Sequence, residues 1–158
     1  MHKSGAITAT PNTHCYTAVI NSCAYCENDA LEKRGALQIA VETYKELLNS
    51  DYGRPNQVTF STVITALRNL SPVSEKRAEA IQNVFRRCAQ DGQVAEFVLL
   101  RLQSALNADQ LREVVGDAAL SSDGSVDIDQ IPDEWKRNAR TKSSRNKRGK
   151  QGLATQMA

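Results

Sequence analysis

Long apolar runs are missing from this sequence, and aromatic residues are scarce. No stretch approaches the roughly 18 consecutive apolar residues that a membrane span needs, so we expect no membrane-embedded segment. Because aromatic residues make up only 5% of the chain, any core must consist mainly of aliphatic side chains. Residues 1–12 also lack the apolar segment of a secretory signal peptide and are too short for a usual organellar presequence. These absences fit a cytosolic or nuclear protein, unless a targeting segment lies outside the sequence.

Cysteine is present but shows no disulfide framework. Cys15, Cys23 and Cys88 fall among apolar residues in helical patterns, which predicts reduced thiols packed in a core and a reducing compartment. The pair Cys23 and Cys26 has the spacing of half a zinc site. Only His14 and Cys88 could complete such a site, and Cys23 lies on the expected buried stripe. Core packing is therefore favoured over zinc binding.

Groups that would carry catalysis or hold ions are also missing. The sequence has no Ser-His-Asp order, no glycine-rich phosphate loop and no HExxH motif. Its two histidines, His2 and His14, have no obvious carboxylate or thiol partners. Residues 123–129 resemble the second half of a calcium loop, but Ala119 and Gln130 would occupy its first and last ligand positions, where neither suits the ion. We therefore expect a non-enzymatic protein with no metal ion, no cofactor and no small-molecule substrate.

Charge is strongly segregated along the chain, although the net charge is only +2. Residues 1–116 carry 12 basic and 12 acidic residues, residues 117–134 carry six acids and no Lys or Arg, and residues 136–158 carry eight basic residues and no acid. This pattern predicts a neutral body, an acidic linker and a basic tail that cannot form a core. The basic side chains of the tail are Lys136, Arg137, Arg140, Lys142, Arg145, Lys147, Arg148 and Lys150.

An internal repeat is the strongest pattern in the sequence. Residues 11–20 (PNTHCYTAVI) and 55–64 (PNQVTFSTVI) share a proline, an asparagine, an aromatic residue, a small hydroxyl residue and Val-Ile in the same order. The Pro-Asn pair is a helix start signal, because the asparagine side chain can cap the first free N–H groups. The two aromatic residues are expected to be buried at equivalent positions. One helix face recurs in both copies at i, i+3, i+4 and i+7: Tyr16, Val19, Ile20 and Cys23, then Phe60, Val63, Ile64 and Leu67.

Further helices are expected after each copy. Apolar stripes over residues 37–48 and 81–88 predict a second helix for each unit, and Gly92 is expected to end the later one. Two more helices are expected at about residues 94–106 and 109–115. No segment shows the alternation of a strand. The sequence therefore predicts an all-α fold of stacked antiparallel helical hairpins, an α-solenoid.

This organisation divides the chain into four parts. We expect an N-terminal arm over residues 1–12, a helical-repeat domain over 13–116, an acidic linker over 117–135 and a disordered basic tail over 136–158. Within the linker, Trp135 lies in a short turn and is available to dock on the last helical pair.

The repeated hairpin resembles the pentatricopeptide repeat family. Four segments carry the resemblance: first-helix residues 16–20 and 60–64, a second helix over residues 36–48 and a closing turn over residues 53–56. The resemblance covers residues 11–92 and weakens into a degenerate third unit that extends to residue 116. The first unit is longer than the family's usual repeat, and we expect the surplus between its two helices, over residues 26–35.

The resemblance implies binding of single-stranded RNA, with one base read per repeat by two or three side chains. The family's reading positions correspond to Thr17 and Asn56 for the first unit, a pairing that goes with adenine, and to Ser61 and Gln93 for the second. A hydroxyl and an amide can both donate to and accept from a base edge. The alternative is that Thr17 and Ser61 are ordinary exposed helix residues and that Asn56 only caps a helix.

The basic tail has three interpretations. Its side chains can contact the phosphates of nucleic acid. Alternatively, Lys136-Arg137 together with Lys147-Arg148 can form a bipartite nuclear import signal, or the tail only improves solubility.

These patterns lead to two functional hypotheses. The first is an RNA-binding helical-repeat protein of organellar RNA processing, stability or translation; the resemblance implies a mitochondrion or plastid, while cytoplasm and nucleus stay open. The second is a protein–protein interaction module in which the hairpins stack on another helical-repeat chain without contacting RNA. The neutral charge of residues 1–116 favours the second, because RNA-binding faces are usually basic.

Overall fold

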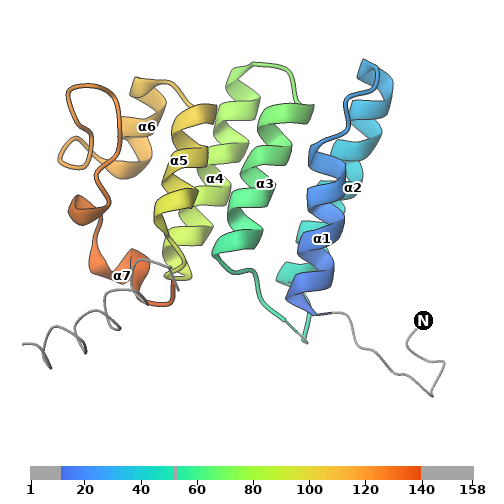
Figure 1. Ribbon diagram of the computed structural model, residues 1–158, viewed down its shortest axis with the longest axis horizontal. Helices are drawn as coiled ribbons and strands as arrows, with labels where there is room; N and C mark the ends of the chain where they lie inside the picture. The colour runs from blue at the N-terminus through green and yellow to red at the C-terminus, as the bar shows by residue number, and fades with distance from the viewer. Residues whose placement is uncertain (1–11, 52, 140–158) are drawn as a thin grey trace, which may run out of the picture.

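The computed structural model describes residues 12–51 and 53–139, and in these ranges it contains helices and no strand (Figure 1). The predicted all-α fold is confirmed. One isolated β-bridge joins Leu120 and Val126. The helices are α1 (Thr13–Ala24), α2 (Ala30–Leu48), α3 (Gln57–Leu70), α4 (Glu75–Gln90), α5 (Glu96–Ala105), α6 (Ala108–Val115), the short 3₁₀ helix η1 (Ile128–Gln130) and α7 (Asp133–Lys136).

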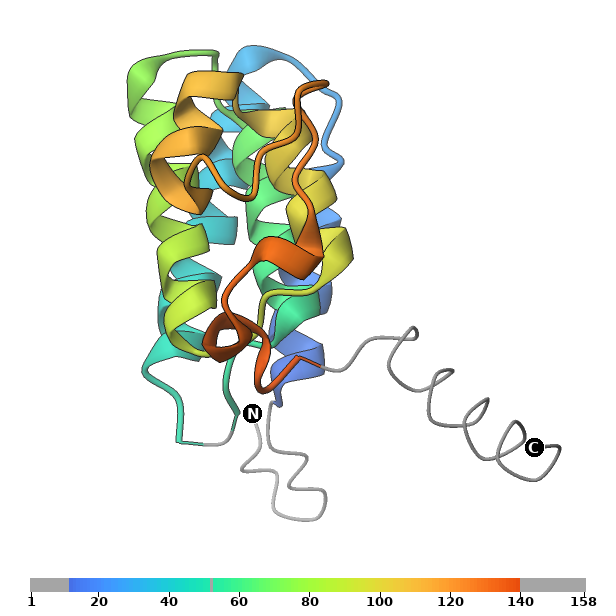
Figure 2. The ribbon, with the colours of Figure 1, turned by 90° about the vertical axis from the view of Figure 1, so that its left-hand side faces the viewer.

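The helices form two layers. α1, α3 and α5 lie side by side in one layer, which we call the first-helix layer, and α2, α4 and α6 lie behind it (Figures 1 and 2). α3 is the central helix, since it packs against α1, α2, α4 and α5. The pairs α1–α2 and α3–α4 are antiparallel hairpins placed next to each other, and α6 packs on α4. This arrangement agrees with the predicted repeat, while a solenoid superhelix stays a prediction.

The two Pro-Asn start signals act alike in the two copies. The Oδ1 atom of Asn12 accepts a hydrogen bond from the backbone N–H of Cys15 at 3.0 Å, and the Oδ1 atom of Asn56 accepts one from that of Thr59, also at 3.0 Å. Each asparagine therefore satisfies an N–H group that the first turn of its helix leaves free. The sequence repeat is thus also a repeat of local structure.

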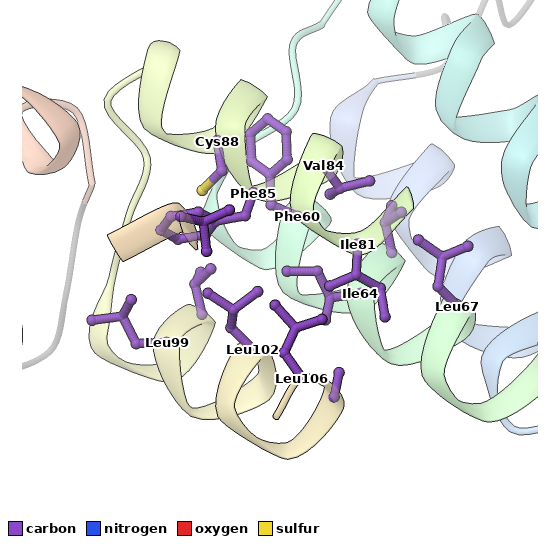
Figure 3. Packing of buried hydrophobic residues seen from close by; sticks show 14 of the residues in the cluster. Phe60, Ile64, Leu67, Ile81, Val84, Phe85, Cys88, Leu99, Leu102 and Leu106 are labelled. Atoms are coloured by element: carbon purple, nitrogen blue, oxygen red, sulfur yellow. The ribbon is translucent and has the colours of Figure 1, made fainter. Parts of the chain in front are cut away.

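The core is centred on α3, whose side chains are buried on almost every side. Phe60 is fully buried, and its ring meets that of Tyr44 from α2 edge to face at a centroid distance of 6.3 Å. Each large apolar side chain removed from water in this way contributes about 1.5–3 kcal/mol. Figure 3 shows how α3, α4 and α5 share this core; its fully or nearly fully buried members include Ile64, Ile81, Phe85, Leu99 and Leu102.

Three predictions about the first hairpin are wrong. α2 begins at Ala30, so the surplus expected between the helices lies mostly inside α2. The reason is Asp29, whose carboxylate caps α2 by accepting the Glu32 N–H at 2.9 Å. Tyr16 is only partly buried, unlike Phe60, and Cys15 is exposed. Among the described helices, α1 has one neighbour in its own layer, α3, whereas α3 has two, α1 and α5. Of the other cysteines expected in the core, Cys88 is buried and Cys23 is partly buried.

Residues 117–139 pack against the helices instead of forming a free linker. Ala119 and Ile131 are buried. The ring of Trp135 meets that of Phe85 from α4 edge to face, with centroids 5.9 Å apart. Trp135 therefore docks as expected, but its partner is Phe85 of α4 and not the last helical pair, α5 and α6, that the sequence suggested.

Two further backbone contacts tie this segment to the turn after α4. The N–H of Val94 donates to the carbonyl of Trp135 at 2.8 Å, and the N–H of Asn138 donates to that of Gly92 at 2.7 Å. Gly92 ends the α4 turn with a φ of 69°, a left-handed conformation that favours glycine. The predicted ending of the helix at Gly92 is confirmed.

Lys136 and Arg137 belong to this folded segment and not to a disordered tail as their charge suggested. The Lys136 Nζ donates to the carbonyl of Ile128 at 2.9 Å, and the Arg137 Nη2 donates to that of Gln90 at 2.9 Å. The six other basic residues expected in the tail lie outside the described residues: Arg140, Lys142, Arg145, Lys147, Arg148 and Lys150.

Candidate nucleic-acid interface

A chain of hydrogen bonds joins the two residues proposed to read the first base. The Oγ1 atoms of Thr17 on α1 and Thr59 on α3 are 2.8 Å apart, and the Thr59 Oγ1 lies 3.2 Å from the Oδ1 of Asn56. The structure therefore brings Thr17 and Asn56 to one junction between adjacent hairpins, linked through Thr59. Sequence reasoning did not include Thr59, although it stands at the same repeat position as Cys15.

The direction of these bonds follows from how many protons are available. Asn56 Oδ1 can only accept, so the hydroxyl proton of Thr59 points to it. The hydroxyl of Thr17 must then donate to Thr59 Oγ1, which also accepts the backbone N–H of Asn56 at 3.2 Å. Thr17 is 8% exposed, so its hydroxyl is both covered and engaged. Asn56, in contrast, is exposed, although its Oδ1 atom caps α3.

The proposed second pair, Ser61 and Gln93, is not joined by such a chain. Ser61 is 7% exposed, and its hydroxyl donates to the carbonyl of Val58 at 3.2 Å. Gln93 is partly buried, and its Oε1 atom is buried with no hydrogen-bond partner among the described residues. An unpaired buried acceptor costs about 1–3 kcal/mol. The two side chains therefore share no bonded cluster comparable to that of the first pair.

The first-helix layer around these residues is almost uncharged. α1 has no Lys, Arg, Asp or Glu, α3 has only Arg68, and α5 has only Glu96 and Arg101. Large apolar side chains are also exposed on each of these helices, namely Val19, Val58 and Leu100. Such a surface suits hydrogen bonding and apolar contact better than it suits phosphate groups.

A basic groove at the opposite end of α3 was missed by sequence reasoning. It has a volume of about 560 Å³ and lies where α2 begins, α3 ends and the α3–α4 connection passes; its cationic lining residues are Lys33, Arg34, Arg68 and Arg77. The four cations come from three separate helices of a body with no net charge, so charge counting does not reveal that they meet. A weak signal is the i, i+3, i+4, i+7 spacing of Ala30, Lys33, Arg34 and Leu37, which puts both cations of α2 on one face.

Burial affects the chemistry of two cysteines, Cys23 and Cys88. Burial, together with the neighbouring Cys26, raises the pKa of the Cys23 thiol, and burial beside Asp91 raises the pKa of the Cys88 thiol well above its usual range. Both are therefore neutral thiols at pH 7. Within residues 12–51 and 53–139, no group of three or more His, Cys, Asp or Glu side chains is arranged to hold a metal ion.

In the described part of the chain, no helix has the length and apolar character needed to cross a membrane. Comparison with known proteins identifies no relative: no protein-family model, curated protein or solved structure matches this chain.

Proposed function

We propose that this chain binds single-stranded RNA across the first-helix layer, with Asn56 meeting one base at the junction of the two hairpins. The observation that carries the proposal is the hydrogen-bond chain from Thr17 through Thr59 to Asn56. It fixes an exposed amide at the start of α3; the Oδ1 atom of this amide is taken up by Thr59, and its NH₂ group can donate to a ring nitrogen at the edge of adenine. The resemblance to pentatricopeptide repeats extends the proposal to organellar RNA processing, stability or translation.

In this proposal Thr17 is a positioning residue for the base contact. Its hydroxyl is covered and donates to Thr59, so it acts on RNA by holding Thr59, which in turn holds Asn56. The uncharged layer would make contacts to bases. Phosphate contacts would then come mainly from basic residues of other helices.

The test replaces Asn56 by serine and measures RNA binding of the full chain by fluorescence anisotropy. Serine retains an oxygen that can cap α3, so folding stability should change little, but it removes the amide donor. Loss of one neutral hydrogen bond of about 0.5–1.5 kcal/mol should weaken binding of a short A-rich oligonucleotide about 2- to 12-fold. Binding of a U-rich oligonucleotide should weaken less.

Asn12→Ser is the matched control. Asn12 caps α1 as Asn56 caps α3, with the same N–H to Oδ1 distance of 3.0 Å, but it lies outside the Thr17–Thr59–Asn56 chain. It should leave the preference for A-rich over U-rich RNA unchanged. Equal losses for both oligonucleotides in Asn56→Ser would reduce Asn56 to a helix cap.

A second candidate function is a protein–protein interaction module, and the uncharged first-helix layer favours it. Val58 is 50% exposed in the first turn of α3, the middle helix of that layer, where it could pack against another helical-repeat chain. Sedimentation velocity of the full chain tests self-association of this kind, with Val58→Glu as the disrupting variant. Concentration-dependent association that Val58→Glu abolishes, with no RNA binding at low salt, would put this candidate first.

A further inference from the structure

The basic groove gathers four positive side chains around one hollow. Lys33 and Arg34 come from the first two turns of α2, Arg68 comes from the last turn of α3, and Arg77 comes from the first turn of α4. Neither Asp nor Glu lines the groove. Asp29 is close in sequence, but its carboxylate accepts the Glu32 N–H at the start of α2.

Two of the arginines are held by neutral backbone carbonyls instead of carboxylates. The Arg77 Nη1 donates to the carbonyl of Arg68 at 2.9 Å, and the Arg68 Nε donates to the carbonyl of Ser104 at 3.2 Å. The ion pairs of the described residues involve other cations, namely Arg87, Arg112 and Lys136. The guanidinium groups are thus oriented while their charge stays uncompensated.

Four like charges around one hollow repel one another, and a bound anion relieves this repulsion. Arginine presents N–H groups in a planar fork that matches a phosphate group. The groove also has an apolar part, which includes the side chains of Leu37 and Val73. Its volume of about 560 Å³ falls within the usual range of small-molecule sites, about 300–1,000 Å³.

We propose that the basic groove binds a phosphate group of the RNA backbone, with the attached ribose and base against Leu37 and Val73. This inference rests on the proposed function and adds the phosphate contacts that the first-helix layer lacks. Asn56 caps the first turn of α3, whereas Arg68 lies in its last turn. At a rise of about 1.5 Å per residue, the two positions are about 18 Å apart along the helix, so an RNA strand that meets both runs along α3.

The test compares two double variants of the full chain that lose equal charge. Lys33→Gln with Arg34→Gln removes two cations from the groove, whereas Lys45→Gln with Arg86→Gln removes one Lys and one Arg that do not line it. Each RNA phosphate contact contributes about 0.7 to the slope of log affinity against log salt. We therefore expect the groove variant, which loses this one phosphate contact, to flatten the slope by about 0.7 and to weaken binding about fivefold at 0.1 M salt. The control variant should leave both nearly unchanged.

A second measurement observes the groove without RNA. Inorganic phosphate is titrated into the ¹⁵N-labelled full chain, and backbone amide shifts are followed by NMR. Residues around the groove should respond in the wild type and in the control variant but not in the groove variant. This comparison also shows that the groove variant is folded, because the remaining amide signals should keep their positions.

The possible outcomes separate this inference from the proposed function. If the wild type binds RNA and both double variants bind it equally well, the groove is no phosphate site and the proposed RNA binding stands. If the wild type binds no RNA, the proposed function fails and the assignment to an RNA phosphate fails with it; the phosphate titration then shows whether the groove takes free phosphate. Loss of affinity and of salt slope only in the groove variant supports the inference.

Discussion

The hydrogen bond between Thr17 and Thr59 should contribute measurably to stability, and the contributions of the two hydroxyls should not add. Thr17→Val removes one hydroxyl with almost no change of shape. Thr59 then keeps both of its contacts with Asn56, at 3.2 Å each. We therefore expect a loss of about 0.5–1.5 kcal/mol, the net value of one buried hydrogen bond.

Thr59→Val should cost more, because it breaks more than one contact. It removes the reciprocal bond of the capping box around Asn56, and it leaves the buried hydroxyl of Thr17 without its partner. An orphaned buried polar group costs about 1–3 kcal/mol, and lost capping adds about 0.5–1 kcal/mol. The double variant leaves no orphaned hydroxyl at either threonine. It should therefore be more stable than the sum of the two single losses predicts, by about 0.5–2 kcal/mol.

Urea unfolding of the full chain and its three variants measures this coupling. Each variant's transition should keep the slope of the wild type, so that midpoints report stability. Additive losses within about 0.3 kcal/mol would show that the two hydroxyls do not interact in solution. The same variants test the positioning role of Thr17: Thr17→Val should reduce the preference for A-rich RNA less than Asn56→Ser does.

Two further predictions concern the fold, and both use urea unfolding. Phe60→Ala should cost about 3–5 kcal/mol because the ring is fully buried. Val58→Ala, two positions earlier at a half-exposed side chain, should cost less than about 1 kcal/mol. Similar losses would mean that the register of α3 is wrong. Gly53→Ala should destabilise the protein, since the added Cβ would lie 2.9 Å from the backbone N of Thr13. Gly35→Ala, inside α2 with open space around it, should instead stabilise the protein by about 0.5–1 kcal/mol. A stabilising effect of Gly53→Ala would contradict the docking of the Gly53 turn on α1.

The features that the sequence predicted well depend on local patterns. Helix starts at Asn12 and Asn56 follow from a capping side chain beside proline, and the end of α4 follows from Gly92. The repeat of these patterns was enough to predict two equivalent hairpins. Burial of Phe60 followed from its place on the apolar stripe, whereas Tyr16 differs because α1 has a neighbouring first-layer helix on only one side.

The features that sequence reasoning missed depend on contacts between distant segments. Thr59 was not singled out because its role needs a partner hydroxyl 42 residues away, on another helix. The basic groove has the same origin, since Lys33 and Arg77 come together only when α2, α3 and α4 pack. Composition also misled for residues 117–139, where acidic and small residues conceal the few apolar side chains that fix the segment, among them Ile131 and Trp135.

The docking of Trp135 determines where the chain can be shortened. A fragment that stops at Gly116 looks complete by helix count, but it would uncover Phe85 and leave the N–H of Val94 without its acceptor. It would also release the turn at Gly92 from Asn138. Because Trp135 is the only tryptophan, its fluorescence reports whether Trp135 is docked on Phe85. The smallest fragment that keeps the α4 end of the protein intact therefore extends to Ala139, beyond α6 and through residues 117–135, which the charge pattern had classed as a linker.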